Sequence, residues 1–175
     1  MDFAAQRAFT LMELMIGLAI IAIVIGLAAP SMAQLHRGQQ LGGYQAELMR
    51  LVQQSRHHAL VNRSRVTVCA LDGQGRCVGL TAGVLSSFVD ANGNRALDAG
   101  ETLLQTLPVP GQLRTHWAGT LPLHSLHFAA QGTTYLSNGT FTLCHPAESA
   151  RHARLVISRQ GRVRAERHAQ PCPLG

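Results

Sequence analysis

Arginine carries all the positive charge of this chain, whose 175 residues include 15 Arg, no Lys, and 9 Asp and Glu, for a net charge of +6. The charge is concentrated at the C-terminal end, where residues 145–175 contain six Arg and two Glu, a net +4. A planar guanidinium pairs with two phosphate oxygens at once, so this composition favours a phosphate-bearing partner. The six arginines are Arg151, Arg154, Arg159, Arg162, Arg164 and Arg167.

Apolar residues alternate with these arginines on both sides of a predicted turn at Gln160-Gly161, which is typical of a β-hairpin. A two-residue loop there would turn Arg162 and Arg164 toward the apolar face. A three-residue loop over 159–161, with Gly161 in the left-handed conformation, instead gathers the apolar side chains on one inner face. We therefore predict the three-residue loop. Its inner face is expected to consist of Leu155, Ile157, Val163 and Ala165.

The three-residue loop also determines which arginines face solvent. Arg154 is expected opposite Glu166 across the hairpin, where the carboxylate would neutralise part of its charge. No aromatic residue lies among the arginines, so the pattern indicates contacts to phosphates without base readout. The alternative is a solvated, charged strand edge that deters aggregation. The arginines predicted to be exposed are Arg154, Arg162 and Arg164, with Arg159 at the tip of the loop.

Residues 90–101 carry oxygen-bearing side chains with the spacing of a calcium-binding loop, at positions 1, 3, 5, 9 and 12 of a twelve-residue frame. The sixth position, which is Gly in such loops, is Arg95, and no helices are predicted on either side. The alternative is a polar loop between strands that is held by Asx turns. We predict no metal or cofactor site, and calcium binding by this loop stays an open alternative.

An apolar segment near the N-terminus contains 22 residues without a charge, from Leu14 to Leu35. As a helix it would span roughly 33 Å, enough to cross the hydrocarbon core of a bilayer. The alternatives are a buried core helix and a secretory signal peptide cut near Ser31. The apolar core of a signal peptide is shorter, and the charge of Glu13 is out of place there. We therefore predict a membrane-spanning helix.

The residues that lead into this segment, Gln6-Arg7-Ala8-Phe9-Thr10-Leu11-Met12-Glu13, resemble the class III signal of type IV prepilins and pseudopilins. In these proteins the prepilin peptidase cuts on the cytoplasmic side, before the Phe, and methylates the new amine. The resemblance implies cleavage between Ala8 and Phe9 and N-methylation of Phe9. The family usually has Gly before the cut, where this chain has Ala8, which is also small.

Glu13 would be the fifth residue of the processed chain, where the family has a nearly invariant Glu. A carboxylate at the edge of hydrocarbon is costly without a partner. The Phe9 amine of a neighbouring subunit would neutralise it in one stagger only, which implies a role for Glu13 in assembly. The alternative is a side chain that reaches up to the headgroups. Pro30 stands where the family has a helix-bending Pro, and we expect it to kink or locally melt the helix.

The helix is predicted to continue to about Val61, because apolar residues recur at steps of three and four from Leu41 to Ala59. From Arg63 onward the period changes to two, which indicates strands separated by Gly, Pro and Asn turns. The predicted fold is α+β and pilin-like, with a long N-terminal helix packed on a mostly antiparallel β domain. Its segments are a leader peptide (1–8), a transmembrane or filament-core helix (9–35), the amphipathic half of the helix (36–62) and a β-rich domain (63–175). The predicted strands are Arg65–Ala70, Gly83–Val89, Thr102–Leu107, Leu113–Trp117, Ser125–Ala129, Thr140–His145, Arg154–Ser158 and Arg162–Arg167.

The β-rich part is similar to the GspH/FimT group of minor pilins and pseudopilins. The matching features are an aromatic residue before an acidic Asn/Gly loop over 88–94, a later Gly100-Glu101, and a C-terminal Cys followed by a Gly-Arg strand. Gly161-Arg162-Val163-Arg164 matches the GRxR motif of FimT-type minor pilins, which bind DNA for uptake in natural transformation. The resemblance implies double-stranded DNA as a partner. The implied binding residues are Arg162, Arg164 and Arg159, with Arg167 and Arg154 as weaker contributors.

Four cysteines allow three possible pairings. The predicted orientation places the β domain in the periplasm, an oxidising compartment in which disulfides form. We prefer Cys69–Cys77, which would close the turn after the first strand, together with Cys144–Cys172, which would hold the tail on a central strand, because local closure costs little entropy. The sequence has no CxxC pair and no tight Cys/His cluster that would indicate zinc.

Two functional classes are consistent with these features. The first is a minor type IV pilin that binds DNA without sequence specificity, with the inner membrane, the prepilin peptidase and other major and minor pilins as further partners. It would be a single-pass inner-membrane protein with a periplasmic C-terminal domain, and would then enter a pilus outside the cell. The second is a structural minor pilin or type II secretion pseudopilin that primes filament assembly without binding DNA. No Ser/His/Asp spacing indicates catalysis, so we predict no enzymatic activity.

Overall fold

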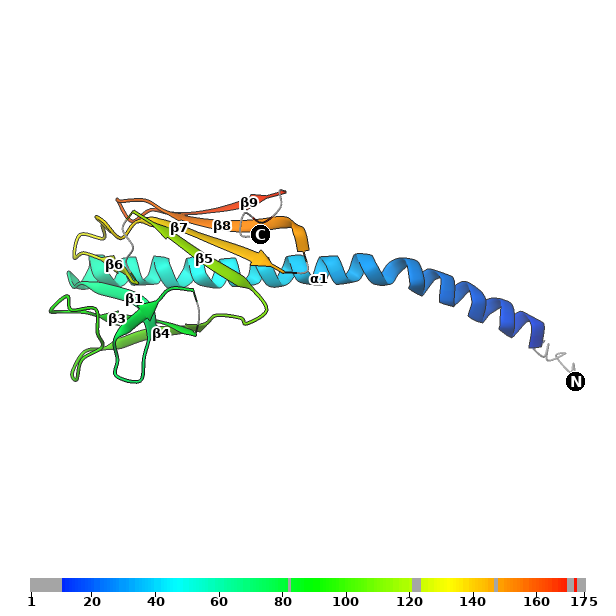
Figure 1. Cartoon of the computed structure of the whole chain (residues 1–175), viewed down its shortest axis with the longest axis horizontal. Coiled ribbons are helices and arrows are strands. Elements are labelled where there is room, and N and C mark those ends of the chain that lie inside the picture. Colours follow the sequence, from blue (N-terminus) through cyan, green and yellow to red (C-terminus); the bar gives the residue numbers. More distant parts are fainter. Residues whose placement is uncertain (1–10, 82, 121–123, 147, 170–171, 173–175) are drawn as a thin grey trace, which may run out of the picture. The chain divides into compact units, whose positions relative to one another are not determined.

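The computed structural model describes residues 11–81, 83–120, 124–146, 148–169 and 172 (Figure 1). The predicted leader and its cleavage site, Ala8 and Phe9, lie outside these residues. The described chain consists of one helix, α1 (Leu11–Asn62), followed by nine strands. It divides into two compact units, Met1–Arg37 and Gly38–Gly175, so that α1 contributes its apolar half to the first unit and its amphipathic half to the second.

The apolar half of α1 exposes its side chains around the whole helix. Every Ile, Leu, Met and Val from Leu11 to Leu35 is at least 52% exposed. A core helix of a soluble protein would bury such side chains, so the exposure argues against the core-helix alternative. Among the described residues, α1 is the one helix that is long and apolar enough to cross a membrane.

The helical backbone continues without interruption at Pro30, so the local melting that we considered does not occur. Proline leaves one carbonyl of the preceding turn without its usual donor. That carbonyl belongs to Gly26, whereas the nearby Ser31 Oγ donates to the carbonyl oxygen of Ala28 at 2.8 Å.

Five antiparallel strands form the first sheet of the second unit. β1 pairs with β3, which in turn pairs with β4, and the other edge of β1 is shared by β2 and β6. The strand β2 was not predicted, because three residues are too few to show an alternating pattern. The strands are β1 (Val66–Leu71), β2 (Cys77–Gly79), β3 (Val84–Val89), β4 (Leu103–Pro108) and β6 (Leu126–Phe128).

The second sheet has four antiparallel strands in the order β5–β7–β8–β9. β8 begins six residues earlier than predicted, in a polar stretch that lacks apolar alternation and is held by its pairing with β7. The other predicted strands are present within one or two residues, and the α+β architecture is confirmed. The strands are β5 (Arg114–Gly119), β7 (Gly139–His145), β8 (Glu148–Ile157) and β9 (Val163–His168).

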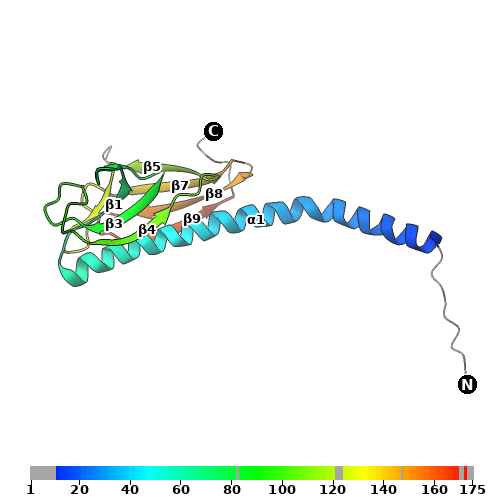
Figure 2. The same ribbon diagram turned by 90° about the horizontal axis from the view of Figure 1, so that it is seen from below.

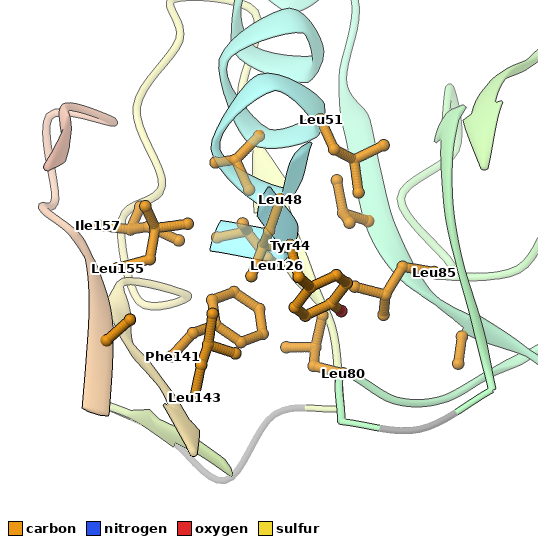
Figure 3. Packing of buried hydrophobic residues seen from close by; sticks show 14 of the residues in the cluster. Tyr44, Leu48, Leu51, Leu80, Leu85, Leu126, Phe141, Leu143, Leu155 and Ile157 are labelled. Carbon is orange, nitrogen blue, oxygen red and sulfur yellow. The ribbon is translucent and has the colours of Figure 1, made fainter. Parts of the chain in front are cut away.

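The amphipathic half of α1 lies along both sheets and closes the core of the second unit (Figures 1 and 2). Its buried side chains recur at three- and four-residue steps, as predicted, from Leu41 through Leu48 to Ala59. Leu48 is fully buried in the same cluster as Phe141 of the second sheet, while Leu51 lies on the side of the first sheet (Figure 3). The whole core cluster falls within Gly38–Gly175, so this unit has its own hydrophobic core.

Candidate nucleic-acid interface

The β8–β9 hairpin has the three-residue loop that the sequence predicts. Ser158 and Arg162 close the loop, since Ser158 N donates to the Arg162 carbonyl at 3.0 Å. Gly161 N donates to the Ser158 carbonyl at 2.8 Å, and Gly161 is left-handed with φ +73°. Leu155 and Ile157 accordingly point into the core, where each is at most 1% exposed.

The register of the hairpin brings three of the predicted arginines to the outer face of the second sheet. Arg154 lies opposite Glu166, and Val156 lies opposite Arg164, so Arg154, Glu166 and Arg164 share the face away from the core. Arg162 has the same alternation as Arg164 and is exposed, as is Arg159 in the loop. The predicted cluster of Arg162, Arg164 and Arg159 is therefore assembled around the turn.

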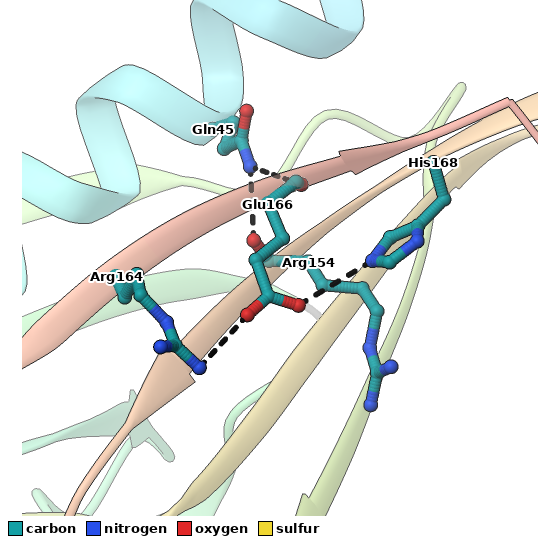
Figure 4. A network of polar contacts seen from close by, with 5 residues as sticks. All are labelled: Gln45, Arg154, Arg164, Glu166 and His168. Atoms are coloured by element: carbon teal, nitrogen blue, oxygen red, sulfur yellow. Dashed lines mark hydrogen bonds and ion pairs between the residues drawn. The ribbon is translucent and has the colours of Figure 1, made fainter.

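Glu166 pairs with different residues from the one predicted. Its Oε1 lies 3.0 Å from Arg164 Nη2, and its Oε2 lies 3.4 Å from His168 Nε2 (Figure 4). Arg154 is its register partner, but the Arg154 guanidinium points away from the carboxylate. The prediction that Glu166 neutralises Arg154 is thus wrong, because the side chains two residues along β9 are better placed to reach it. Arg164, with a side chain 62% exposed, carries the compensated charge.

Arg167 lies on the other side of the strand from the predicted cluster. Its Nε donates to Gln45 Oε1 of α1 at 3.5 Å. A Cβ atom added at Gly42 would lie 3.0 Å from Arg167 Nη2, so the guanidinium rests against the helix. The structure therefore does not bring Arg167 together with Arg162 and Arg164.

Contacts from α1 and from the β6–β7 loop hold the hairpin in place. Gln45 Nε2 donates to the carbonyl oxygens of Arg154 at 2.9 Å and Glu166 at 3.0 Å (Figure 4). Near the tip, Arg56 donates to the carbonyl oxygens of Gly132 at 3.0 Å and Gln160 at 3.1 Å. These contacts give the exposed arginines a fixed backbone.

The strand β5 adds to this face an arginine, Arg114, and a histidine, His116, that sequence reasoning missed. Because β5 pairs with β7 and β7 pairs with β8, His116 and Arg154 lie in one row across the sheet. Arg114 is two residues before His116 on β5 and therefore lies on the same face. Both side chains are exposed. The alternation Arg-Thr-His in the predicted strand would have placed them on one face, but only the sheet order shows which face.

The four cysteines form the two predicted disulfides. Cys69 and Cys77 join β1 to β2 with a Cα–Cα distance of 5.4 Å. Cys144 and Cys172 join β7 to the tail with a Cα–Cα distance of 5.9 Å. Since Cys144 shares the outer face of the second sheet, this bond brings Cys172 to the same face as the arginines.

The loop over 90–101 uses its oxygen atoms within itself. Asn92 Oδ1 accepts from Asn94 N at 3.0 Å, and Asp98 Oδ2 accepts from the side-chain amides of both asparagines at 2.8 and 2.7 Å. Glu101 accepts from the backbone of Ala91 at 2.9 Å. The Asn92–Asn94 contact is an Asx turn, as is the bond from Ala96 N to Asn94 Oδ1 at 2.9 Å, which agrees with the polar-loop alternative. In the described part of the chain, no group of three His, Cys, Asp or Glu is arranged to hold a metal ion.

Two family models match the chain. The model of the type II transport protein GspH matches residues 45–161, which is more than half of the chain. The model of the prokaryotic N-terminal methylation motif matches residues 3–29, which contain the predicted cleavage site and Glu13. No match was found among curated proteins.

Solved structures of pilin-like proteins share the fold. One is the type IV minor pilin FimU of Pseudomonas aeruginosa, solved in two crystal forms. The first form is 21% identical with a TM-score of 0.52, and the match covers 72% of this chain and 92% of FimU. The second form is 20% identical with a TM-score of 0.55, and the match covers 75% of this chain and 92% of FimU. The minor pseudopilin EpsH from the type 2 secretion system of Vibrio cholerae is 12% identical with a TM-score of 0.50, covering 72% of this chain and 95% of EpsH. At these identities the likeness shows a common fold.

Proposed function

The chain belongs to the GspH family of pilin-like proteins, and from this premise we propose that it is a minor type IV pilin that binds double-stranded DNA and supports its uptake in natural transformation. The observation that carries the proposal is the exposed arginine cluster around the β8–β9 turn: Arg162, Arg164 and Arg159. Arg154 extends the cluster along the outer face of the second sheet.

The chemistry of this face fits the phosphate backbone of a duplex. Guanidinium groups pair with phosphate oxygens. Among the outward-facing side chains that the structure describes in β5, β7, β9 and residues 152–157 of β8, Glu166 is the one carboxylate. The same positions carry no Phe, Tyr or Trp, since Trp117 packs inward on Phe141. Binding through phosphates alone is independent of sequence and weakens as salt rises.

The N-terminal half of the chain fits the same function. We propose cleavage between Ala8 and Phe9 by the prepilin peptidase, methylation of Phe9, and pairing of Glu13 with the amine of a neighbouring pilin. The apolar half of α1 would then hold the protein in the inner membrane, with the β unit in the periplasm, until it joins the filament. Several copies in one filament would add avidity to weak single contacts.

The second candidate is a structural minor pilin or a type II secretion pseudopilin that primes filament assembly. It is favoured by the matching family model, which describes a type II transport protein. In that case the arginine face would be a solvated sheet surface without affinity for DNA.

Replacement of Arg162 and Arg164 together by Gln tests the proposal, with the full chain in a non-ionic detergent and a fluorescent duplex. We expect the wild-type chain to bind with a Kd on the order of 10⁻⁴ to 10⁻⁶ M and the double variant to lose most of this affinity. Both side chains face solvent, so folding should be unchanged.

The matched control is the double variant Arg76→Gln/Arg167→Gln, which removes the same charge from positions away from the outer face. It should bind within about twofold of the wild type. Equal losses in both double variants would mean that net charge, and not the cluster, attracts the DNA. No binding by the wild type at low salt would leave the structural-pilin function in its place.

A further inference from the structure

The residues with a left-handed backbone gather near the end of α1. Among the described residues other than glycine, three have a positive φ: Arg63 (48°), Arg95 (63°) and Tyr135 (45°). Such a backbone is costly for a residue with a side chain, and it often occurs at functional sites. Two of the three side chains, Arg95 and Tyr135, line one cavity of about 250 Å³, which Arg65 also lines.

The charge of this cavity comes from two arginines and one carboxylate. Neither Arg65 nor Arg95 forms an ion pair with a described residue, and the Arg65 guanidinium rests directly on Gly93, where a Cβ atom would meet it. Asp90 is fully buried, and its Oδ2 accepts from Thr67 Oγ1 at 2.7 Å and from Arg95 N at 3.3 Å. The carboxylate thus holds the loop that carries Arg95 while leaving the cavity a net positive charge.

His127 adds no charge to this balance. Burial, and then the charges of Arg95 and Arg65, lower the pKa of His127, and the opposing effect of Asp90 is smaller. The ring is therefore neutral at neutral pH, and the two guanidinium groups are the cations of the site.

Tyr135 presents an aromatic ring beside these cations. The side chain is 54% exposed, and its hydroxyl accepts a hydrogen bond from Gln131 Nε2. The neighbouring Thr134 N donates to the Arg159 carbonyl at 2.9 Å. The wall of the cavity is therefore bonded to the tip of the hairpin that carries the proposed duplex-binding cluster.

We propose that this cavity binds one unpaired nucleotide of a DNA strand, with its base stacked on the Tyr135 ring and its phosphates paired with Arg65 and Arg95. The proposal rests on the DNA-binding function above and adds a second contact to it. Paired bases inside a duplex are stacked on each other, so only a strand end or a single strand can present a base face to Tyr135. An aromatic ring next to guanidinium groups is the usual combination in sites for single-stranded nucleic acid.

The test compares three fluorescent DNAs on the full chain in detergent: a short single strand, a blunt linear duplex, and a closed duplex, which is a covalently closed circular duplex with neither ends nor loops. Tyr135→Leu should weaken binding of the single strand at least about fivefold, because it removes one stacking contact, and leave the closed duplex unchanged. Tyr135→Phe should restore the affinity for the single strand. Leu136→Ala is the matched control, since Leu136 is the adjacent exposed residue of the same loop, 51% exposed.

Competition separates a nucleotide site from a simple anion site. Thymidine monophosphate should displace the single strand at a lower concentration than inorganic phosphate does, and Tyr135→Leu should reduce this difference, because only the nucleotide has a base that stacks. If Tyr135→Leu binds the single strand like the wild type, or phosphate competes equally well, the proposal is overturned. Loss of closed-duplex binding in the Arg162→Gln/Arg164→Gln variant would then still support the proposed function, whereas failure of all three DNAs to bind would refute both.

Discussion

Glu166 determines how much charge the outer face of the second sheet offers to a phosphate. Its carboxylate lies 3.0 Å from Arg164 Nη2, one of the two side chains at the centre of the cluster. An exposed pair of this kind contributes little to stability, about 0–1 kcal/mol. Its main effect is on binding, because a phosphate must compete with Glu166 for Arg164.

Glu166→Gln is therefore expected to raise the affinity for duplex DNA roughly two- to fivefold at low salt, without a loss of stability. Fluorescence anisotropy on the full chain measures the change. Glu47→Gln removes the same charge from an exposed site on α1 and should have a smaller effect. An affinity no higher than that of the control would show that Arg164 does not contact the DNA.

Gly161 makes the turn possible for two independent reasons. Its φ of +73° disfavours any other residue, and a Cβ atom there would lie 2.1 Å from the carbonyl oxygen of Gly132. Gly161→Ala should lower the free energy of unfolding by about 2 kcal/mol or more, since the backbone of the turn or the β6–β7 loop must move. Gly111→Ala, at a position with open space, is the control. Thermal unfolding of residues 38–175, which contain the whole core, measures both; a loss no larger than that of Gly111→Ala would contradict the role of this glycine.

The alternation of side chains along β9 is enough to predict which face of the strand carries Arg167. Arg167 is four positions after Val163, so a period of two already assigns it to the inner side, away from Arg162 and Arg164. By contrast, the pairing of Glu166 with Arg164 and His168 depends on side-chain conformations that alternation does not specify.

At the scale of elements, the hairpin loop was predictable because one loop length alone puts four apolar residues on the inner face. The sheet order was not, since β1 receives β6 from far along the chain and β7 lies between β5 and β8. The presence of Arg114 and His116 on the outer face depends on that order. The anchoring of the hairpin by Arg56 and Gln45 likewise depends on where α1 crosses the sheet.

The two disulfides should contribute unequally to the stability of the β unit. Cys144–Cys172 closes a loop with a sequence separation of 28, and Cys69–Cys77 one of 8. Loop-closure entropy then assigns about 3.5 kcal/mol to the first and about 2.5 kcal/mol to the second. Replacing each pair by Ala and following denaturant unfolding of residues 38–175 tests this order. A larger loss for the Cys69/Cys77 pair would show that native packing, and not loop closure, dominates.

At the scale of the whole molecule, the two units differ in whether they bury their apolar side chains. The unit Gly38–Gly175 buries its own core, whereas the Ile, Leu, Met and Val side chains from Leu11 to Leu35 remain more than half exposed. Such a surface is stable in a bilayer, or against the same helices of other subunits in a filament. The exposed apolar half of the helix is recognisable from the sequence, because a run of 22 residues without a charge does not depend on how the rest of the chain packs.

The proposed cleavage at Ala8–Phe9 would allow the apolar helix to pass from the bilayer into the filament. The charged and polar residues of the predicted leader, Asp2 and Gln6-Arg7, favour the aqueous side of the membrane, and their removal would leave an amine on Phe9 for the carboxylate of Glu13 in a neighbour. Coexpression with a prepilin peptidase should therefore yield a mature chain that starts at methylated Phe9. Intact mass and N-terminal sequencing of membrane-extracted protein measure this.

Ala8→Gly should be cut at least as fast, because it restores the residue usual in the family, and Ala8→Leu should not be cut, because a large side chain replaces a small one at the scissile bond. A mature chain that starts near Ser31 would identify an ordinary signal peptide instead, and the segment now assigned to the filament would then be absent from the exported protein.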